Sequence, residues 1–206
     1  MADDLILYTN PMSRGRVARW MLEETGAPYR VEILDYASTM KAPAYLAINP
    51  MGKVPAIVHG GKVVTENAAI CAYLADAFPS AGLAPPSSER ADYYRWLFFA
   101  AGPLEYAVTN NAFGMKPPPD REAAVGYGNY QKALDTLEYA VTRMPFIAGD
   151  RFTAADLYVG SHLGFGMQFG SIEKRPAFEA YYNKLKDRPA ALRAAALDDA
   201  AMPKKG

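Results

Sequence analysis

Cysteine, histidine and excess charge are all scarce in this chain. A single cysteine, Cys71, excludes an internal disulfide framework and suits a reducing compartment. The two histidines, His59 and His162, lie far apart without cysteine or clustered acids around them, which gives a metal site little support. Lys and Arg number 22 and Asp and Glu number 22, so no electrostatic argument favours nucleic acid or an anionic membrane as a partner.

Long apolar runs are also missing. No stretch approaches the ~20 apolar residues of a membrane-spanning helix. The amino-terminal segment is acidic and lacks the basic and apolar regions of a signal peptide. Half of the residues are nevertheless hydrophobic, and 206 residues are enough for one large or two small domains with proper cores. We therefore expect a globular cytoplasmic protein with no nucleic-acid partner and no membrane contact.

The first third of the chain has the pattern of a sheet packed against helices. Residues 5–8 form an apolar run typical of a buried strand, and residues 29–33 alternate apolar and charged as a strand with one buried face does. The segment between them has helical spacing, ends near Gly26, and places Arg19 and Glu23 one turn apart, where they can pair. Such a strand, helix, strand unit predicts two parallel strands.

A β-hairpin follows, after a possible short helix over residues 42–48. Two strand-like runs, 56–59 and 62–65, meet at Gly60-Gly61, a dipeptide that accepts the positive φ angles of a two-residue turn. A helix is predicted over residues 67–78. Together these elements predict a four-stranded mixed sheet with helices against it.

The two ends of the hairpin carry residues that suit ligand binding. Pro55 at the entrance forces Val54 toward an extended backbone and leaves peptide groups there free to pair with something other than a strand. At the exit, Glu66 and Asn67 stand beside the unpaired N–H groups of a helix start. A small peptide-like ligand would suit this arrangement.

The composition changes at residues 80–87, which are rich in proline and small residues and read as a linker. No convincing strand lies beyond them, and apolar residues recur at helical spacing. Thr153 and Asp156 match a variant of the helix capping box. The chain is therefore predicted to be α+β, with a sheet-bearing domain over residues 1–79 and an all-helical domain over residues 88–206.

Three motifs, in the expected order, identify a resemblance that covers nearly the whole chain. They are Asn-Pro-Met-Gly-Lys-Val-Pro at 49–55, Glu-Asn-Ala-Ala-Ile at 66–70, and the run from Phe146 to Asp156. The sequence resembles the cytosolic glutathione S-transferases, a family with bacterial members and a serine-dependent branch. The resemblance implies a thioredoxin-like N-terminal domain that binds glutathione, a helical C-terminal domain that shapes an electrophile pocket, and a homodimer. It also implies a cis peptide at Val54–Pro55.

Such a site must stabilise a thiolate, because a thiol with a pKa near ~8.5 is mostly protonated at neutral pH. Ser13 stands at the start of the first helix, where serine-dependent members place their hydroxyl, although the residues around it depart from the better-known pattern. The residues alone allow a simple N-cap at Ser13. Tyr8, in the apolar strand and expected to point into the core, and Asn10 are the other candidates.

The ligand contacts implied by the resemblance involve Lys41, Lys53, Val54, Pro55, Glu66 and Asn67. Glu66 would accept hydrogen bonds from the γ-glutamyl amino group, and Asn67 would meet the neighbouring carboxylate at a helix N-terminus. The Val54 backbone would pair with the cysteinyl unit as an added strand does. The two lysines are candidates for the glycyl carboxylate. From the residues alone, Glu66 is a helix-dipole residue and the lysines are solvated.

The resemblance implies a glutathione transferase of the detoxifying kind, which directs the thiolate at a small hydrophobic electrophile and needs no cofactor beyond glutathione as co-substrate. Alternatives are a glutathione-dependent peroxidase or disulfide reductase, and a non-catalytic glutathione-binding protein. The missing Cys-x-x-Cys argues against a thioredoxin-type oxidoreductase, and the helical position of Cys71 against cysteine-dependent thiol transfer. Tyr106, Phe113 and Met115 either line the electrophile pocket or belong to the core.

Overall fold

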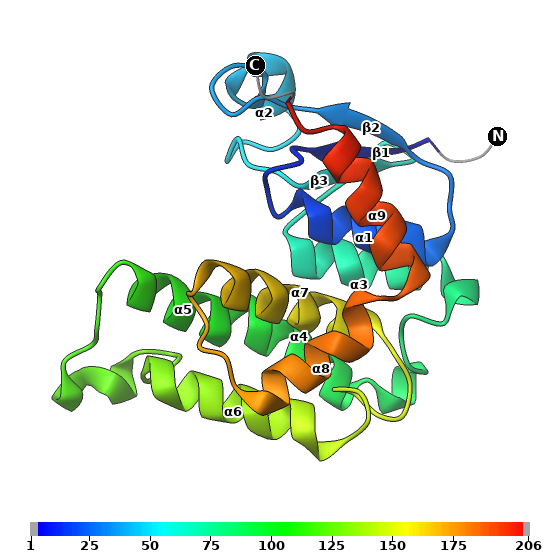
Figure 1. The fold of residues 1–206 in the computed structure, drawn as a ribbon. Coiled ribbons are helices and arrows are strands. Elements are labelled where there is room, and N and C mark those ends of the chain that lie inside the picture. Colours follow the sequence, from blue (N-terminus) through cyan, green and yellow to red (C-terminus); the bar gives the residue numbers. More distant parts are fainter. Residues whose placement is uncertain (1–3, 204–206) are drawn as a thin grey trace. The chain divides into compact units, whose positions relative to one another are not determined.

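A computed structural model describes residues 4–203, so most of the acidic amino-terminal stretch lies outside the described residues. The chain divides into two compact units, one with residues up to Leu83 together with those from Arg188 onward, and one over Ala84–Asp187. The first unit contains β1 (Leu5–Thr9), α1 (Gly15–Thr25), β2 (Arg30–Ile33), α2 (Pro43–Leu46), β3 (Ala56–His59), β4 (Lys62–Thr65), α3 (Asn67–Ala77) and α9 (Pro189–Ala200) (Figure 1).

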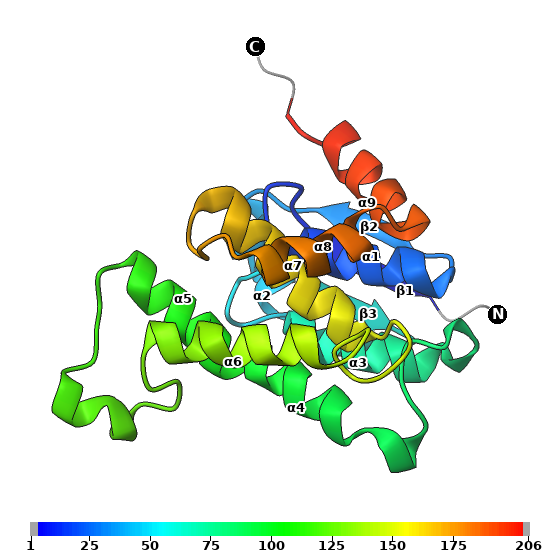
Figure 2. The ribbon, with the colours of Figure 1, turned by 60° about the horizontal axis from the view of Figure 1, so that its bottom comes forward.

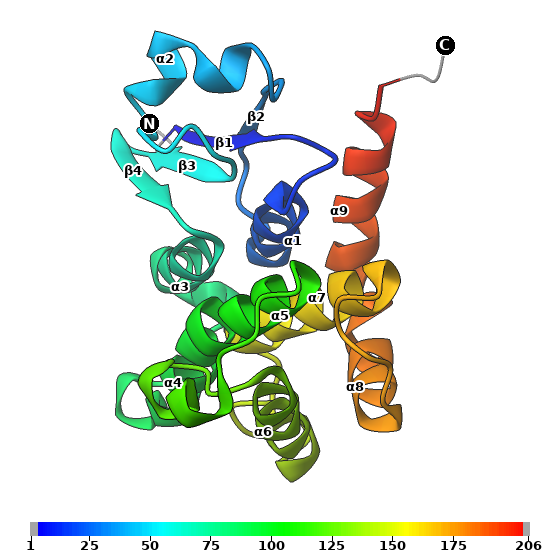
Figure 3. The ribbon, with the colours of Figure 1, turned by 90° about the vertical axis from the view of Figure 1, so that its left-hand side faces the viewer.

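The sheet of the first unit has four strands in the order β2-β1-β3-β4. β1 is parallel to β2 and antiparallel to β3, and β3 is antiparallel to β4, which confirms the predicted mixed sheet. α2 lies on one face of the sheet, and α1 and α3 lie on the other (Figure 3). The hairpin turn has positive φ angles at Gly60 (55°) and Gly61 (77°), as the two-residue turn requires.

α1 begins at Gly15 and ends at Gly26, whose left-handed φ of 67° is the helix-ending conformation that glycine adopts without steric cost. Within this unit α1 lies between α3 and α9, and Figure 3 looks along α1 and α3 with α9 seen from its side. Val17, Met21 and Leu22 of α1 are buried. The predicted helix is therefore confirmed, and it is the central element of the helical layer.

The C-terminal helix belongs with the sheet rather than with the helical segment that precedes it. The predicted helical domain ran to residue 206, whereas α9 packs along α1 in the first unit. Arg19 shows the physical reason, because its Nε donates to Asp198 Oδ1 of α9 at 2.8 Å, with Arg19 4% and Asp198 0% exposed. The expected Arg19–Glu23 pair is wrong, and Glu23 instead accepts hydrogen bonds from Tyr29 and Arg193.

The second unit is helical throughout its described elements. It contains α4 (Ala91–Phe99), α5 (Glu105–Ala112), α6 (Tyr130–Arg143), α7 (Ala154–Phe169) and α8 (Pro176–Lys186). Gly102 and Pro103 lie in a π-helical stretch, Ala100–Leu104, that joins α4 to α5. A wider turn accommodates a proline, which has no N–H to donate and whose ring crowds the preceding turn. No described helix is both long and apolar enough to cross a membrane.

A buried capping box fixes the start of α7. Asp156 Oδ2 accepts hydrogen bonds from the backbone N–H and the hydroxyl of Thr153, both at 2.8 Å. Asp156 Oδ1 accepts from the Ile147 N–H at 2.7 Å and from the Tyr181 hydroxyl. The predicted box is therefore confirmed, and it joins the preceding loop, α7 and α8 at one carboxylate.

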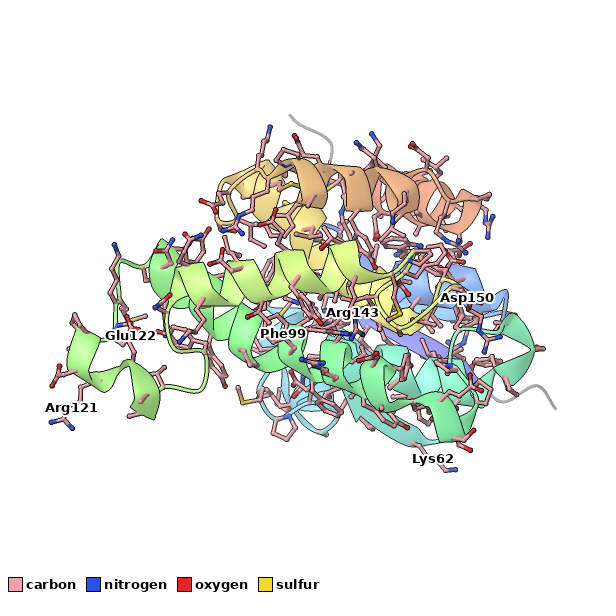
Figure 4. All side chains as sticks on the ribbon, turned by 90° about the horizontal axis from the view of Figure 1, so that it is seen from below. Lys62, Phe99, Arg121, Glu122, Arg143 and Asp150 are labelled. Atoms are coloured by element: carbon pink, nitrogen blue, oxygen red, sulfur yellow. The ribbon has the colours of Figure 1, made fainter. Side chains whose placement is uncertain are left out.

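The connection from α5 to α6 extends away from the other helices of this unit (Figure 2). It contains a 3₁₀ turn at Pro119–Ala124. Arg121 lies at the outer part of this connection and points away from the helices (Figure 4), and its side chain is 74% exposed. Residues 116–118, which precede the 3₁₀ turn, are in neither helix nor strand.

Candidate functional site

The entrance of the hairpin presents an unpaired backbone edge. Val54–Pro55 is a cis peptide, as the resemblance implied. Lys53 immediately before it is held by two side chains, because its carbonyl oxygen accepts from the Tyr45 hydroxyl at 2.5 Å and from Asn49 Nδ2 at 2.8 Å. Within residues 4–203, by contrast, the N–H and C=O of Val54 have no hydrogen-bond partner. The local contacts therefore fix a peptide edge and leave it open to a ligand.

The exit of the hairpin is a strained helix start. Glu66 has φ 66° and ψ 121°, and it is the one non-glycine residue with positive φ in the described part of the chain. Such a conformation costs on the order of 1–3 kcal/mol and is concentrated at functional sites. The Glu66 side chain is exposed and makes no cap to α3. The carboxylate and the first N–H groups of α3 therefore remain available to one ligand.

Asn67 links this helix start to the loop before α1. Its Nδ2 donates to the carbonyl oxygen of Arg14 at 3.1 Å, across 53 residues of sequence. Its Oδ1 is buried and has no partner among the described residues. Asn67 thus connects the two halves of the candidate site, and its buried Oδ1 can still accept a hydrogen bond from a ligand donor.

Ser13 lies in that loop, although it is not the residue that caps α1. Its hydroxyl donates to the carbonyl oxygen of Asn10 at 2.6 Å and accepts from the N–H of Gly15 at 2.9 Å. Arg14 occupies the cap position. The hydroxyl oxygen is therefore fixed at the amino end of α1, where the helix dipole favours negative charge.

The two competing candidates have other partners. Asn10 is 6% exposed, and its amide donates to the Leu34 carbonyl at 2.8 Å and accepts from the Met12 N–H at 2.9 Å. The Tyr8 ring packs against the core cluster of Met40, Tyr45 and Ala56, with its centroid 5.6 Å from that of Tyr45. Tyr8 thus points into the core, as expected, and Asn10 organises the loop.

The two lysines differ in what their side chains do. Lys41 Nζ donates to the Gly52 carbonyl at 2.6 Å, so this ammonium reinforces the motif before the cis peptide. Lys53 is exposed, and its backbone carbonyl carries the contacts described above. The structure therefore brings Lys41 to the hairpin segment and leaves the Lys53 side chain at the surface.

Three parts of the first unit converge on this region. β1 places Tyr8 opposite Ala56, which brings the loop after β1 to the segment that carries the cis peptide. The Asn67–Arg14 hydrogen bond brings the start of α3 to the same loop.

Sequence reasoning missed Tyr45 and Asn49 as supports of Lys53. The signal available for Asn49 was its place in the Asn-Pro-Met-Gly motif. A short polar side chain just before a tight turn often forms hydrogen bonds with nearby backbone groups.

Cys71 and the residue types that bind metals give no alternative site within residues 4–203. Complete burial of Cys71 raises the pKa of its thiol to about 12. This thiol is therefore protonated and inert at neutral pH, which agrees with the argument against cysteine-dependent thiol transfer. Among residues 4–203, no group of three or more His, Cys, Asp or Glu could hold a metal ion. Tyr106, Phe113 and Met115 are 63%, 74% and 52% exposed, which excludes the alternative that they are core residues.

The fold and this geometry define a class: a thioredoxin-like domain that offers a cis-proline edge and a helix N-terminus to a peptide ligand. Sequence comparison then gives the family. Residues 3–76 match the N-terminal domain of glutathione S-transferase. The chain is 30% identical over 205 residues to glutathione S-transferase GST-4.5 of Xanthomonas campestris, covering 93% of this chain and 99% of the relative. The chain therefore belongs to the glutathione S-transferase family.

Solved structures agree with this assignment. A glutathione transferase from Methylococcus capsulatus matches with a TM-score of 0.77 and 30% identity over 95% of this chain and 99% of that one. A sphingomonad glutathione S-transferase complexed with glutathione matches with a TM-score of 0.76 and 30% identity, over 94% and 98% of the two chains. The thioredoxin-like fold of the first unit, followed by a helical part, is thus confirmed.

Proposed function

We propose that this protein is a glutathione transferase that binds glutathione in its first unit and stabilises the thiolate for attack on hydrophobic electrophiles. The observation that carries the proposal is the open edge at Val54, held beside a strained helix start at Glu66. Family membership supports the activity, and the glutathione complex of the sphingomonad relative supports the ligand.

Glutathione would lie between the hairpin and α3. Its cysteinyl backbone would pair with the N–H and C=O of Val54, next to Pro55. Its γ-glutamyl carboxylate would meet Asn67 and the first N–H groups of α3, while its amino group would donate to Glu66. Lys53 and Lys41 would attract the glycyl carboxylate, and Lys41 would exchange its contact with the Gly52 carbonyl to do so.

The thiolate would be stabilised by Ser13. The hydroxyl has one proton, which it donates to the Asn10 carbonyl at 2.6 Å. That carbonyl also accepts the Ser13 N–H at 3.0 Å, so it keeps a partner when the hydroxyl turns to sulfur. The Gly15 N–H polarises the same oxygen. A hydrogen bond to the anion lowers the thiol pKa, and the thiolate sulfur then forms a bond to the electrophilic carbon as the leaving group departs.

The remaining features of the proposal follow the family. The second unit would shape the electrophile pocket, with Tyr106, Phe113 and Met115 as adaptable apolar lining. We propose that the protein acts as a homodimer in the cytoplasm, with glutathione as co-substrate and no other cofactor.

Calorimetry with glutathione and turnover of a generic aromatic electrophile test the proposal. Ser13→Ala should keep glutathione binding and lose on the order of 100-fold in kcat, because only thiolate stabilisation is removed. Turnover of an organic hydroperoxide alone would instead indicate a glutathione-dependent peroxidase. Binding without any turnover would indicate a non-catalytic protein, and the absence of binding would refute the proposal.

A further inference from the structure

The loop that carries Ser13 is held by hydrogen bonds among its own residues and by one to Leu34. The Asn10 carbonyl accepts both the N–H and the hydroxyl of Ser13, at 3.0 and 2.6 Å. The Asn10 side chain accepts the Met12 N–H at 2.9 Å and donates to Leu34 at the end of β2 at 2.8 Å. The carbonyl of Pro11, another group of this loop, also has a partner outside the loop.

Arg16 supplies that partner. Its Nε donates to the Pro11 carbonyl at 2.7 Å. Its Nη2 donates to Asp199 Oδ1 of α9 at 2.6 Å. One guanidinium therefore joins the loop before α1 to a helix 183 residues further along the sequence. The fork of the guanidinium allows both contacts at once, which a lysine ammonium does not reproduce.

The contact with Pro11 matters because it fixes one peptide plane from both sides. The Pro11 carbonyl is held by Arg16, and the Met12 N–H of the same peptide unit is held by the Asn10 side chain. A peptide unit is rigid and planar, so holding its oxygen and its hydrogen fixes its orientation. Ser13 follows directly, and its hydroxyl position depends on that orientation.

We propose that Arg16, anchored by Asp199, is a positioning residue that sets the Ser13 hydroxyl for the thiolate. This inference rests on the proposed function of Ser13. Without the Arg16 contact the Pro11–Met12 peptide rotates more freely, and the hydroxyl spends less time in hydrogen-bond reach of sulfur. A displacement of about 1 Å at a reacting group costs up to ~100-fold in rate. The effect therefore falls on thiol ionisation more than on glutathione affinity.

The test measures the pKa of the thiol of bound glutathione. The ultraviolet absorbance of the thiolate in the binary complex is recorded as a function of pH to obtain this pKa. Arg16→Gln should raise this pKa by about one unit. At pH values below the pKa, the thiolate fraction, and with it kcat/KM, should then fall about tenfold. The dissociation constant from calorimetry should stay within about threefold. Asp199→Asn should shift the pKa less in the same direction, because the Pro11 contact remains.

Two further variants sharpen the test. The double variant Arg16→Gln/Asp199→Asn should equal Arg16→Gln alone, since both changes act through one contact. Arg16→Lys should fail to restore the wild-type pKa. Arg193→Gln is the matched control, because it removes another ion pair between α9 and α1, with Glu23, that does not reach the loop. The control should keep the wild-type pKa.

An unchanged thiol pKa in Arg16→Gln, or an equal shift in Arg193→Gln, would overturn the inference. The wild-type protein separates this failure from failure of the proposed function. If the wild type binds glutathione and lowers its thiol pKa while Arg16→Gln does the same, only the role of Arg16 is refuted. If the wild type neither binds glutathione nor lowers its thiol pKa, both proposals are refuted.

Discussion

The candidate site has two halves, the hairpin half around Val54 and Pro55 and the loop half from Asn10 to Arg14. They are held in place in different ways. The hairpin half is held by near neighbours in sequence: Asn49 reaches Lys53 across 4 residues, Tyr45 reaches Lys53 across 8, and Lys41 reaches Gly52 across 11. The loop half around Ser13 is held from far away, through Leu34, Asn67 and α9. A local scaffold thus presents the ligand edge, while a long-range one positions the group that would activate the thiol.

This difference separates binding from activation. Damage to the hairpin half should weaken glutathione binding and leave the bound thiol as acidic as before. Damage to the far supports of the loop should change the stability of α1 or the thiol pKa and leave the ligand edge intact. Each of the following changes is chosen to test that separation.

The largest effect should come from the buried ion pair that holds α9 on α1. Asp198→Ala leaves the Arg19 guanidinium buried without its partner, which should reduce the stability of the first unit by about 3–5 kcal/mol. Hydrogen exchange of the α1 amides, resolved by mass spectrometry, measures this loss. Arg193→Gln, which removes an exposed pair on the same interface, should cost no more than about 1 kcal/mol. Equal effects of the two changes would contradict the special role of the buried pair.

Asn49→Ala should have the next largest effect, on the hairpin half. It removes the donor to the Lys53 carbonyl and the acceptor of the Met51 N–H, two contacts of a side chain that is 4% exposed. We expect a loss of about 2 kcal/mol, seen as a dissociation constant for glutathione that rises roughly thirtyfold. The thiol pKa of bound glutathione should not move. A shifted pKa with unchanged affinity would reverse the proposed division of roles.

Asn110→Ala is the control for that change. This asparagine donates to the Tyr127 hydroxyl in the second unit, so its loss removes a comparable contact without touching the first unit. Glutathione affinity should stay within about twofold of the wild type, which is below ~0.5 kcal/mol.

Asn67→Ala cuts the hydrogen bond that joins the two halves. The change removes the contact with the Arg14 carbonyl at 3.1 Å together with the proposed contact to the γ-glutamyl carboxylate, so we expect a loss of at least about 1 kcal/mol. Calorimetry should show glutathione affinity reduced at least about fivefold. An unchanged affinity would mean that the halves do not depend on this link. Asn67→Ser retains a short polar side chain at the helix start and should lose less than Asn67→Ala.

The smallest effect should come from Cys71. Cys71→Ala should leave turnover within about twofold, because a buried thiol with a pKa of about 12 does not react near neutral pH. Loss of turnover would instead indicate that the protein belongs to the cysteine-dependent branch of the family.

The same pKa gives a stability change of defined sign. Burial raises the pKa of Cys71 from its ordinary value of 9.0 to about 12, so between these values the folded state holds a proton that the unfolded state has lost. Unfolding free energy therefore falls as pH rises through this window, by up to about 1.4 kcal/mol per pH unit. Denaturation near pH 8 and near pH 10 should show that Cys71→Ala reduces this dependence.

The strands and the turn of the hairpin half could be predicted almost to the residue because their signals are local, whereas the supporting contacts of Tyr45 and Asn49 were missed. Gly60-Gly61 specifies the turn, and both strands were predicted with the bounds that the structure has. The loop half could not, because Arg16 and Asp199 have no sequence pattern that relates them. Arg19 illustrates the same limit: a favourable partner one turn away was available, yet a buried carboxylate from α9 takes its place. Long-range partners override local pairing when both groups are buried.

The return of α9 to the sheet has a consequence for how the protein is made. The residues that complete the helical layer around α1 are translated only after the whole of Ala84–Asp187. Domains generally fold as units in the order of their synthesis. Here the first unit leaves the ribosome incomplete, with the buried Arg19 side of α1 uncovered, while the second unit is still being translated. During synthesis α9 can therefore dock on α1, and bring Asp199 to Arg16, only after the second unit has been translated.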